Sequence, residues 1–307
     1  MDSTQTTRRE MLISSELDHP AREMKRHAMR TETEVFTSLL RWAFHDRNLR
    51  AIIVNGSRAD PSRIPDALSD YDVAVVVSDL DPVRSGDWIE QFGEIMVRWP
   101  LNPEPTFDAA WITQLVLFTD HIRIDFQFTN PDIQKIEQSG PYHCVLVDHD
   151  GLTESIQGRS VDGATIDPPT AREFAERVNA FWWDIPYVAK ALRRGEIDYA
   201  RFMMESNLRF EKLHPLIRWR IGVVHGPDTD AGIFGRWFDR YLEPEIWEFY
   251  LETFSEANPD DQWRAMFAMA SFVRLLAQEL AAESDFTYPD GVDEAVSEYL
   301  RELHSGR

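Results

Sequence analysis

The sequence has almost no cysteine. Cys144 is the single cysteine among 307 residues, which excludes an intrachain disulfide and a metal site built on several thiolates. It stands in the apolar segment 142–147, so we expect a buried thiol without a chemical role. This cysteine usage fits the reducing environment of the cytoplasm.

Basic side chains are scarce relative to acidic ones. The chain has 32 Lys and Arg residues against 53 Asp and Glu residues, and its formal net charge is −21 at pH 7. A surface this acidic repels a phosphate backbone, so a nucleic acid is a poor candidate for a partner. The same field attracts cationic molecules, although a role in solubility explains the charge equally well.

Long apolar segments are missing as well. No segment approaches the roughly 18 uncharged apolar residues that a membrane-spanning helix needs, and Met1–Gln5 are not followed by the apolar core of a signal peptide. We therefore expect a cytoplasmic protein without a membrane partner. Hydrophobic residues nevertheless form 43% of the chain, which is sufficient for packed cores, and the length indicates two domains.

The first half of the chain predicts both helix and strand after a polar extension, residues 1–28, to which we assign no chemistry. Thr31 and Glu34 have the spacing of a capping box that begins a helix. This helix is expected to bury an apolar face made of Val35, Leu39, Leu40, Ala43 and Phe44. Apolar and β-branched runs then predict strands, with a hairpin between the third and fourth, at residues 51–54, 72–77, 115–119, 122–128 and 142–147.

The second half of the chain has helical spacing throughout. A second capping box at Thr170 begins a helix that ends at Gly195 and is expected to bend at Pro186. Its apolar stripe comprises Phe174, Val178, Phe181, Ile185, Val188 and Leu192. Further helices are expected at residues 199–220, 235–254, 261–283 and 291–303. The predicted organisation is an α/β domain, a linker with adjacent prolines and a helical domain, at residues 29–155, 156–169 and 170–307.

Polar residues that suit phosphate chemistry follow the predicted strands. Asn55-Gly56-Ser57-Arg58 come directly after one strand, Asp70 and Asp72 stand at the start of the next, and Asp125 lies on the polar face of a later one. Asp70 and Asp72 are two residues apart on an extended segment, so both carboxylates project from one face, with Cα atoms roughly 6–7 Å apart. Hard oxygen ligands of this kind suit Mg²⁺, which completes its coordination with water and substrate phosphates.

The other residues of this group favour a pocket for a triphosphate. Gly56 lets the backbone approach phosphates closely, Ser57 offers its hydroxyl and its amide, and Arg58 adds positive charge. If its strand lies beside that of Asp72, Asp125 is placed to bind a second metal ion or to take a proton from an attacking hydroxyl. The pattern therefore predicts transfer of a nucleotidyl group with release of pyrophosphate.

These residues resemble the polymerase-β-like nucleotidyltransferase superfamily, and more closely the aminoglycoside 6-adenylyltransferases, also called streptomycin adenylyltransferases. The likeness extends over nearly all of the chain after residue 28, through segments such as Arg123-Ile124-Asp125, Phe181-Trp182-Trp183 and Tyr288-Pro289. The resemblance implies an α+β fold, with an N-terminal mixed sheet with helices and an all-α C-terminal domain. It also implies Mg²⁺ as cofactor, ATP as co-substrate, and three metal-binding and catalytic residues, Asp70, Asp72 and Asp125.

The same resemblance assigns substrate contacts to the helical domain. Lys190 is similar to the lysine that reaches the triphosphate in related enzymes. Trp182 is implied as a wall for the sugar rings, and Asp184 as a partner for a cationic group of the antibiotic. Because adjacent helical residues point about 100° apart, we expect at most one residue of the pair Trp182-Trp183 to line the cleft and the other to join the core.

The sequence departs from the family pattern at Ala180, where a glutamate is expected, and at Asp60, where an asparagine is expected. The first departure lies next to the implied acceptor wall, so the reaction class is better supported than the acceptor. The predicted function is ATP- and Mg²⁺-dependent transfer of AMP to a hydroxyl of an aminoglycoside, with streptomycin as the expected substrate and antibiotic resistance as the outcome. Two alternatives stay open: the same chemistry on another small-molecule or protein hydroxyl, and a catalytically silent protein that binds nucleotide or antibiotic.

Overall fold

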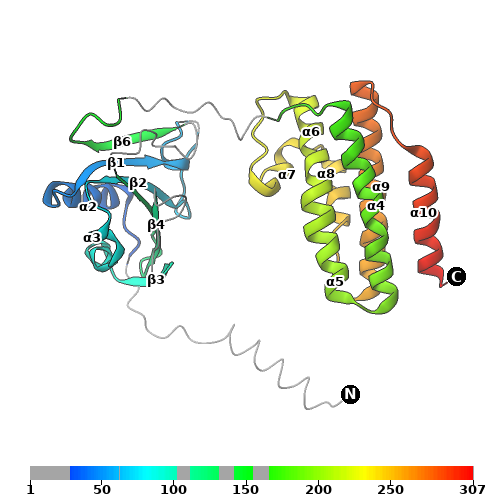
Figure 1. The fold of residues 1–307 in the computed structure, drawn as a ribbon, viewed down its shortest axis with the longest axis horizontal. Coiled ribbons are helices and arrows are strands. Elements are labelled where there is room, and N and C mark those ends of the chain that lie inside the picture. Colours follow the sequence, from blue (N-terminus) through cyan, green and yellow to red (C-terminus); the bar gives the residue numbers. More distant parts are fainter. Residues whose placement is uncertain (1–27, 62, 102–110, 131–141, 155–165, 307) are drawn as a thin grey trace, which may run out of the picture. The chain divides into compact units, whose positions relative to one another are not determined.

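The structure is a computed structural model that describes residues 28–61, 63–101, 111–130, 142–154 and 166–306. The chain divides into two compact units, Met1–Ser160 and Val161–Arg307, and each unit is described by itself (Figure 1). The predicted N-terminal extension and most of the predicted linker lie outside the described residues.

A six-stranded mixed sheet forms the frame of the first unit, in the order β3-β4-β5-β2-β1-β6 (Figure 1). The neighbours β2 and β5 run parallel, and the other neighbouring strands run antiparallel. The strands are β1 (Leu49–Asn55), β2 (Tyr71–Val77), β3 (Ile95–Trp99), β4 (Ile112–Phe118), β5 (Arg123–Thr129) and β6 (His143–Asp148). The five strands predicted from the sequence are confirmed, whereas the sequence pattern did not reveal β3.

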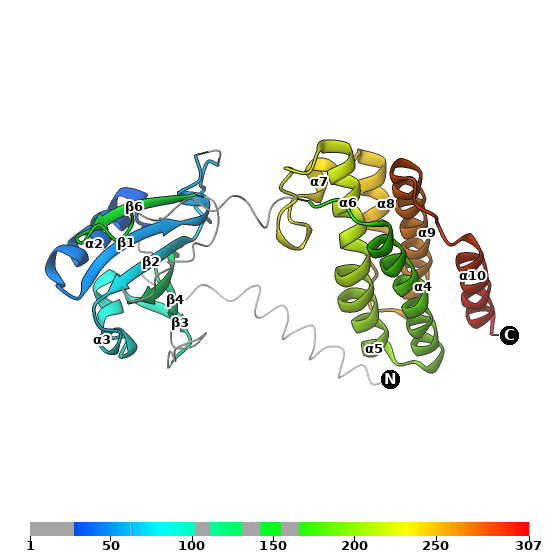
Figure 2. The same ribbon diagram turned by 45° about the horizontal axis from the view of Figure 1, so that its top comes forward.

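Helical segments accompany the sheet, and α2 lies against β1 and β6 (Figure 2). These segments are α2 (Glu32–His45), η1 (Gly56–Arg58), α3 (Asp81–Arg84) and η2 (Asp87–Phe92). The predicted capping box is confirmed, because the Glu34 amide donates to the Thr31 hydroxyl and the Glu34 carboxylate accepts from the Thr31 amide at 2.7 Å.

The apolar face of α2 is narrower than predicted. Val35, Leu39 and Ala43 are buried, but Leu40 is 43% exposed and Phe44 is 84% exposed. Trp42 is also buried near the C-terminal end, next to Ala43. Because successive helical residues are about 100° apart, Phe44 points away from the side of α2 on which Trp42 lies.

An aromatic cluster lies between α2, η2 and one face of the sheet. Trp42 of α2 stacks on Trp88 of η2, with ring centroids 5.1 Å apart, and both rings contact Phe126 and Phe128 of β5. Phe126 and Phe128 are fully buried, as the alternating pattern predicts. Because side chains alternate along a strand, this packing directs Asp125 to the opposite face of the sheet.

The strands β4 and β5 form the predicted hairpin around Asp120 and His121. The Phe118 amide donates to the Ile122 carbonyl at 2.9 Å, and the His121 amide donates to the Phe118 carbonyl at 2.9 Å. His121 has a φ of 68°, the left-handed conformation for which a hairpin loop normally uses glycine. The tight loop therefore forms with a histidine in the glycine position.

The prediction of a buried Cys144 is wrong. Cys144 lies on β6 and is exposed. Among the described strands β6 has a neighbour on one side only, so its apolar run is not enclosed as that of a central strand would be.

The second unit is helical (Figure 1), which confirms the predicted α+β class with a mixed sheet first and helices after it. Its longer segments are α4 (Ala171–Arg194), α5 (Ile197–Phe202), the π-helical segment η3 (Met203–Leu213), α6 (His214–His225), α8 (Pro244–Glu252), α9 (Pro259–Ser284) and α10 (Asp290–Ser305). Two short segments, η4 (Ile233–Gly235) and α7 (Phe238–Tyr241), lie between α6 and α8.

The predicted start, end and apolar stripe of α4 are confirmed. The helix begins with the capping box of Thr170 and Glu173, and it ends at Gly195, whose φ is 73°. It continues through Pro186 as a single element. The six residues of its predicted apolar stripe are all buried.

The helix α9 supplies much of the core of the second unit. Within the described residues it is the one helix long and apolar enough to cross a membrane, with 26 residues and an 18-residue window whose mean hydropathy is 1.3. More than half of that apolar window, 56%, is buried inside the unit, where α9 packs against α4 and α6. Core packing therefore accounts for its composition.

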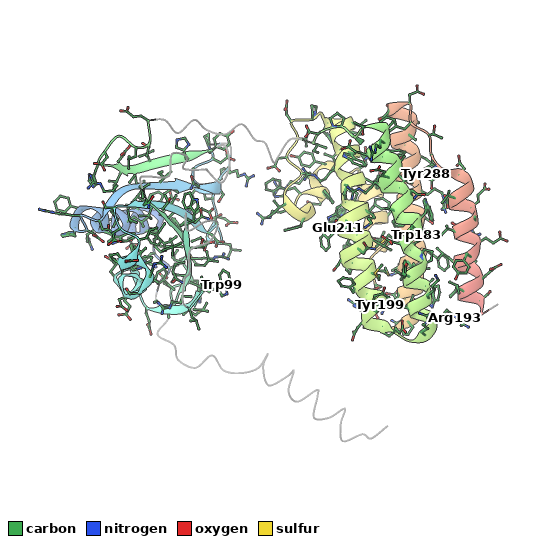
Figure 3. The ribbon with its side chains drawn as sticks, viewed as in Figure 1. Trp99, Trp183, Arg193, Tyr199, Glu211 and Tyr288 are labelled. Carbon is green, nitrogen blue, oxygen red and sulfur yellow. The ribbon has the colours of Figure 1, made fainter. Side chains whose placement is uncertain are left out.

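Arginines hold the helices of this unit together through buried acceptors. Arg274 of α9 forks onto Asp293 of α10, and the Tyr288 hydroxyl donates to the same carboxylate at 2.7 Å (Figure 3). Arg209 of η3, whose side chain is only 1% exposed, forms an ion pair with Glu205 and donates to the carbonyl of Thr253, which follows α8, at 2.8 Å. Each buried charge has several hydrogen bonds, which offsets the cost of its removal from water.

We predict that His214 makes the second unit less stable as the pH falls below about 6.5. Burial, with the nearby charges of Arg209 and Arg218, lowers the pKa of His214 from 6.5 to about 4. Between these values the unfolded chain binds a proton that the folded chain excludes, so the free energy of unfolding falls by up to about 1.4 kcal/mol per pH unit. Urea unfolding of wild type and His214→Gln between about pH 7 and pH 5 measures this effect.

The variant His214→Gln keeps a polar group within reach of the Tyr250 hydroxyl, which lies 3.0 Å from His214 Nε2. It has no proton to gain in this range, so its stability should change less with pH. An equal slope in the two proteins would exclude His214 as the source of the pH dependence.

Candidate active site

Polar side chains lie in one row across the centre of the sheet. Asp72 of β2 pairs with Asp125 of the parallel strand β5, and Asn55 of β1 pairs with Asp72. Residues paired in this way project from the same face, which here is the face opposite the aromatic cluster. The structure thus brings Asp72 and Asp125 together, as expected if their strands are neighbours.

Arg123 connects Asp125 with Asp70. Its Nε and Nη2 atoms each lie 2.8 Å from one oxygen of the Asp125 carboxylate, which gives a two-pronged ion pair. Its Nη1 atom lies 3.5 Å from Oδ2 of Asp70, the residue that precedes β2. One guanidinium group therefore joins two acidic side chains from separate segments of the chain.

Asp72 stands in a setting that disfavours its charge. Burial raises the pKa of the Asp72 carboxyl above its ordinary value, and the charges of Asp125 and Asp70 raise it further, while Arg123 acts in the opposite direction. The hydrogen bond to Asp125 raises the pKa of Arg123 in turn. The excess of negative charge favours a bound cation at this row.

Gly56 lies directly against Asp72. Its φ is 69°, and a Cβ atom at this position would stand 2.2 Å from Oδ2 of Asp72. Glycine is therefore required twice, for the left-handed backbone and for the space that the carboxylate fills. Ser57 is the next residue of the same short helical turn, η1, and this position places its hydroxyl and its amide near the acidic row.

Asn55 ends β1 beside Asp72 and is 5% exposed. Among the described residues, its buried Oδ1 atom has no hydrogen-bond partner. A buried acceptor without a donor is uncommon in proteins and often marks a functional site. Asn55 therefore belongs with the candidate site residues.

The structure corrects the role expected for Arg58. Its guanidinium donates to the carbonyls of Asp70 at 3.2 Å and Ser69 at 2.7 Å, and to the Glu32 carboxylate at 2.8 Å. It also stacks on the Tyr71 ring at 3.7 Å, and its side chain is only 6% exposed. These contacts direct most of the guanidinium donors to neighbouring groups, so Arg58 fixes the backbone before β2.

The acidic residues fit a divalent cation in the chemistry of their donors, since Asp72 and Asp125 place hard carboxylate oxygens side by side. Within the part of the chain that the structure describes, no three His, Cys, Asp or Glu side chains are gathered to enclose a metal ion. Two neighbouring carboxylates suit Mg²⁺, which keeps water ligands and takes others from substrate phosphates.

The structure also corrects the choice between the two tryptophans of α4. Trp182 is fully buried, with its ring under the Arg274 guanidinium, so it belongs to the core and cannot line a substrate surface. Trp183 is 71% exposed on the outside of α4 (Figure 3). The two residues point in different directions as expected, but the exposed one is Trp183.

Asp184 and Lys190 are both held by neighbours within the second unit. The Asp184 carboxylate accepts a hydrogen bond from the Asn207 amide at 2.8 Å and lies 3.5 Å from Lys212 Nζ. The Lys190 ammonium lies over the ring of Tyr187, 5.5 Å from its centroid. No described contact pairs Lys190 with a carboxylate.

The sequence pattern assigned no individual role to Arg123 or Asn55, and it left Trp183 as the alternative to Trp182. The signal for Arg123 was available, because a residue two positions before Asp125 on a strand shares its face. The signal for Asn55 needed the pairing of β1 with β2, and the exposure of Trp183 needed the packing of α4.

The chain is similar in sequence to known adenylyltransferases. A sequence model of the streptomycin adenylyltransferase family matches residues 29–303. An aminoglycoside 6-adenylyltransferase of Bacillus subtilis (strain 168) is 28% identical over 287 residues, which cover 90% of this chain and 99% of the relative. One from Campylobacter jejuni is 29% identical over 278 residues, which cover 89% of this chain and 95% of the relative.

A solved structure, the crystal structure of an aminoglycoside 6-adenyltransferase from Bacillus subtilis, is 25% identical in sequence. The alignment covers 90% of this chain and 99% of that one, with a TM-score of 0.45.

We predict that Gly56→Ala destabilises the first unit by about 2–4 kcal/mol, because the added methyl group requires both a left-handed alanine and a displaced Asp72. The matched control is Gly151→Ala in the same unit, where φ is 70° and the nearest atoms to a Cβ, on Glu154, are 3.8 Å away. The control variant should lose only about 1 kcal/mol of unfolding free energy, because alanine is disfavoured in a left-handed conformation. Urea unfolding measures both losses, and equal values would contradict the close approach of Gly56 to Asp72.

Proposed function

The chain belongs to the streptomycin adenylyltransferase family, and on this premise we propose that it transfers AMP from ATP to a hydroxyl of an aminoglycoside, with release of pyrophosphate. As an adenylyltransferase it is an enzyme that takes a nucleotide as co-substrate. We propose streptomycin as the acceptor, since the family carries its name, and antibiotic resistance as the physiological outcome.

One observation within the first unit carries this proposal. Asp72 and Asp125 lie side by side on the parallel strands β2 and β5, and Gly56 packs its backbone against Asp72. Paired carboxylates beside a glycine turn are the arrangement that metal-assisted phosphoryl and nucleotidyl transfer requires.

We propose that Asp70, Asp72 and Asp125 hold Mg²⁺, which on binding neutralises charge on the triphosphate. Gly56 admits the phosphates close to the backbone, and Ser57 donates hydrogen bonds to their oxygens. Asp125 also has the position to accept the proton of the attacking hydroxyl.

In the second unit we propose that Trp183, in place of Trp182, stacks against the sugar rings of the acceptor. Aromatic rings offer a rigid apolar face of this kind. We also propose that Asp184 pairs with a cationic group of the antibiotic and that Lys190 contacts the triphosphate.

We predict that the wild-type protein, incubated with streptomycin, ATP and Mg²⁺, adds one AMP to the antibiotic, as measured by mass spectrometry. The variant Asp72→Asn should lower this rate by about 10²-fold or more, because it removes a charged oxygen ligand from the centre of the row. Its thermal stability should be equal or higher, since the folded protein disfavours the Asp72 charge.

The matched control is Asp150→Asn, which removes a carboxylate paired with Arg50 near the start of β1, away from the site. This variant should retain the wild-type rate. Absence of any AMP adduct with streptomycin and with a panel of other aminoglycosides would overturn the proposed acceptor class, and full activity of Asp72→Asn would overturn the role of Asp72.

We predict opposite effects for the two tryptophans of α4. Trp183→Ala should raise KM for streptomycin by roughly threefold to tenfold and leave the melting temperature nearly unchanged, because an exposed ring contributes contact and little packing. Trp182→Ala should destabilise the second unit by about 3–5 kcal/mol. Initial rates of pyrophosphate release and thermal unfolding separate the two, and an unchanged KM for Trp183→Ala would remove it from the acceptor wall.

A further inference from the structure

Arg123 lies among the acidic residues of the proposed site, and the sequence pattern did not assign it a role. It begins β5 two residues before Asp125, so both side chains project from one face of the sheet. Its guanidinium forks onto Asp125 and reaches Asp70, as described above. A fixed positive charge therefore stands at a site that is expected to bind divalent cations.

The fork occupies both oxygens of Asp125. Each oxygen accepts one N–H at 2.8 Å, the geometry of a strong charge-assisted pair. A carboxylate keeps further lone pairs, so a divalent cation can still bind Asp125, but it then shares each oxygen with a cation that is already present. Two positive charges this close repel each other, which weakens binding of the second.

Exposure distinguishes this pair from the buried arginine pairs of the second unit. The Arg123 side chain is 43% exposed and that of Asp125 is 14% exposed. Replacement of Arg123 therefore removes little packing, and the remaining effects are its charge and its hold on the Asp125 rotamer.

We propose that Arg123 is the resident counterion of this acidic row. Its charge balances Asp70 and Asp125 in the absence of divalent cations and so sets the concentration at which Mg²⁺ fills the site, and its fork holds Asp125 in one orientation. This role rests on the proposed function, because it assumes that the row binds Mg²⁺.

Two substitutions distinguish the effect of the positive charge of Arg123 from the effect of its fork onto Asp125. Arg123→Lys keeps a positive charge but lacks the planar fork that holds both oxygens of Asp125. Arg123→Gln has neither the charge nor the fork. The matched control is Arg50→Gln, which removes an arginine forked onto Asp150 near the start of β1 in the same unit.

The test is a titration with Mg²⁺ alone, without ATP, followed by thermal unfolding at low ionic strength. Arg123→Gln should reach half of its Mg²⁺-induced stabilisation at roughly threefold to tenfold lower Mg²⁺ than wild type. Arg123→Lys and Arg50→Gln should stay within about twofold of wild type. The difference for Arg123→Gln should shrink at about 0.5 M NaCl, because salt screens a half-exposed charge.

Asp72→Asn supplies the background response to Mg²⁺ at sites elsewhere. If wild type responds above this background and Arg123→Gln has the same midpoint as wild type, Arg123 does not act as a counterion, while the metal site stands. If wild type responds no more than Asp72→Asn, the metal assignment fails and the role of Arg123 fails with it.

AMP transfer gives a second readout. Arg123→Lys and Arg123→Gln should both turn over more slowly than wild type, and to a similar extent, because neither side chain holds both oxygens of Asp125. Full turnover of Arg123→Lys would show that Asp125 needs no fork, which would overturn the orienting part of the proposal.

Discussion

Repulsion between carboxylates on neighbouring strands is the constraint on which the rest of this sheet depends. Asp72 and Asp125 are paired in register on β2 and β5, an arrangement that sheets ordinarily avoid. The strands cannot relax by sliding, because a shift of one residue would move Phe126 and Phe128 out of the aromatic core and onto the polar face. Burial of the apolar face therefore holds the charges together, and cations offset the repulsion that results.

The turn after β1 brings the backbone and the carboxylates to the same place by two different means. Gly56 has no side chain, and the Asp72 carboxylate fills the space that a Cβ atom of residue 56 would need. Arg58, two residues later, has a long side chain that ties the carbonyls of Ser69 and Asp70 to this turn and lies over Tyr71. A change in either residue alters the position of the acidic row without removing any carboxylate from it.

Local patterns predicted most of the fold, because capping boxes, apolar stripes and β-branched runs depend on neighbouring residues alone. The prediction of a buried Cys144 failed because burial depends on strand order, and among the described strands β6 lies at the edge of the sheet. For the site, Asp72 and Asp125 could be foreseen, whereas the contacts of Arg58 could not, since a guanidinium that serves backbone carbonyls has the same sequence signal as one that serves phosphates. Trp182 and Trp183 differ only by a rotation of about 100° around α4, and the core of the second unit decides which of them is buried.

The overall charge of −21 has opposite consequences for the two proposed substrates. A cationic aminoglycoside is attracted by the field of the whole protein, which raises its rate of encounter. ATP is repelled by the same field, so its approach depends on positive charge concentrated near the triphosphate pocket and on the Mg²⁺ that it carries. Arg123, which pairs with Asp125 and Asp70, offsets part of the negative charge of the acidic row. An acidic enzyme can thus favour its cationic acceptor at long range and still bind an anionic nucleotide, because local cations act over a few ångströms whereas the general field is screened beyond about 10 Å.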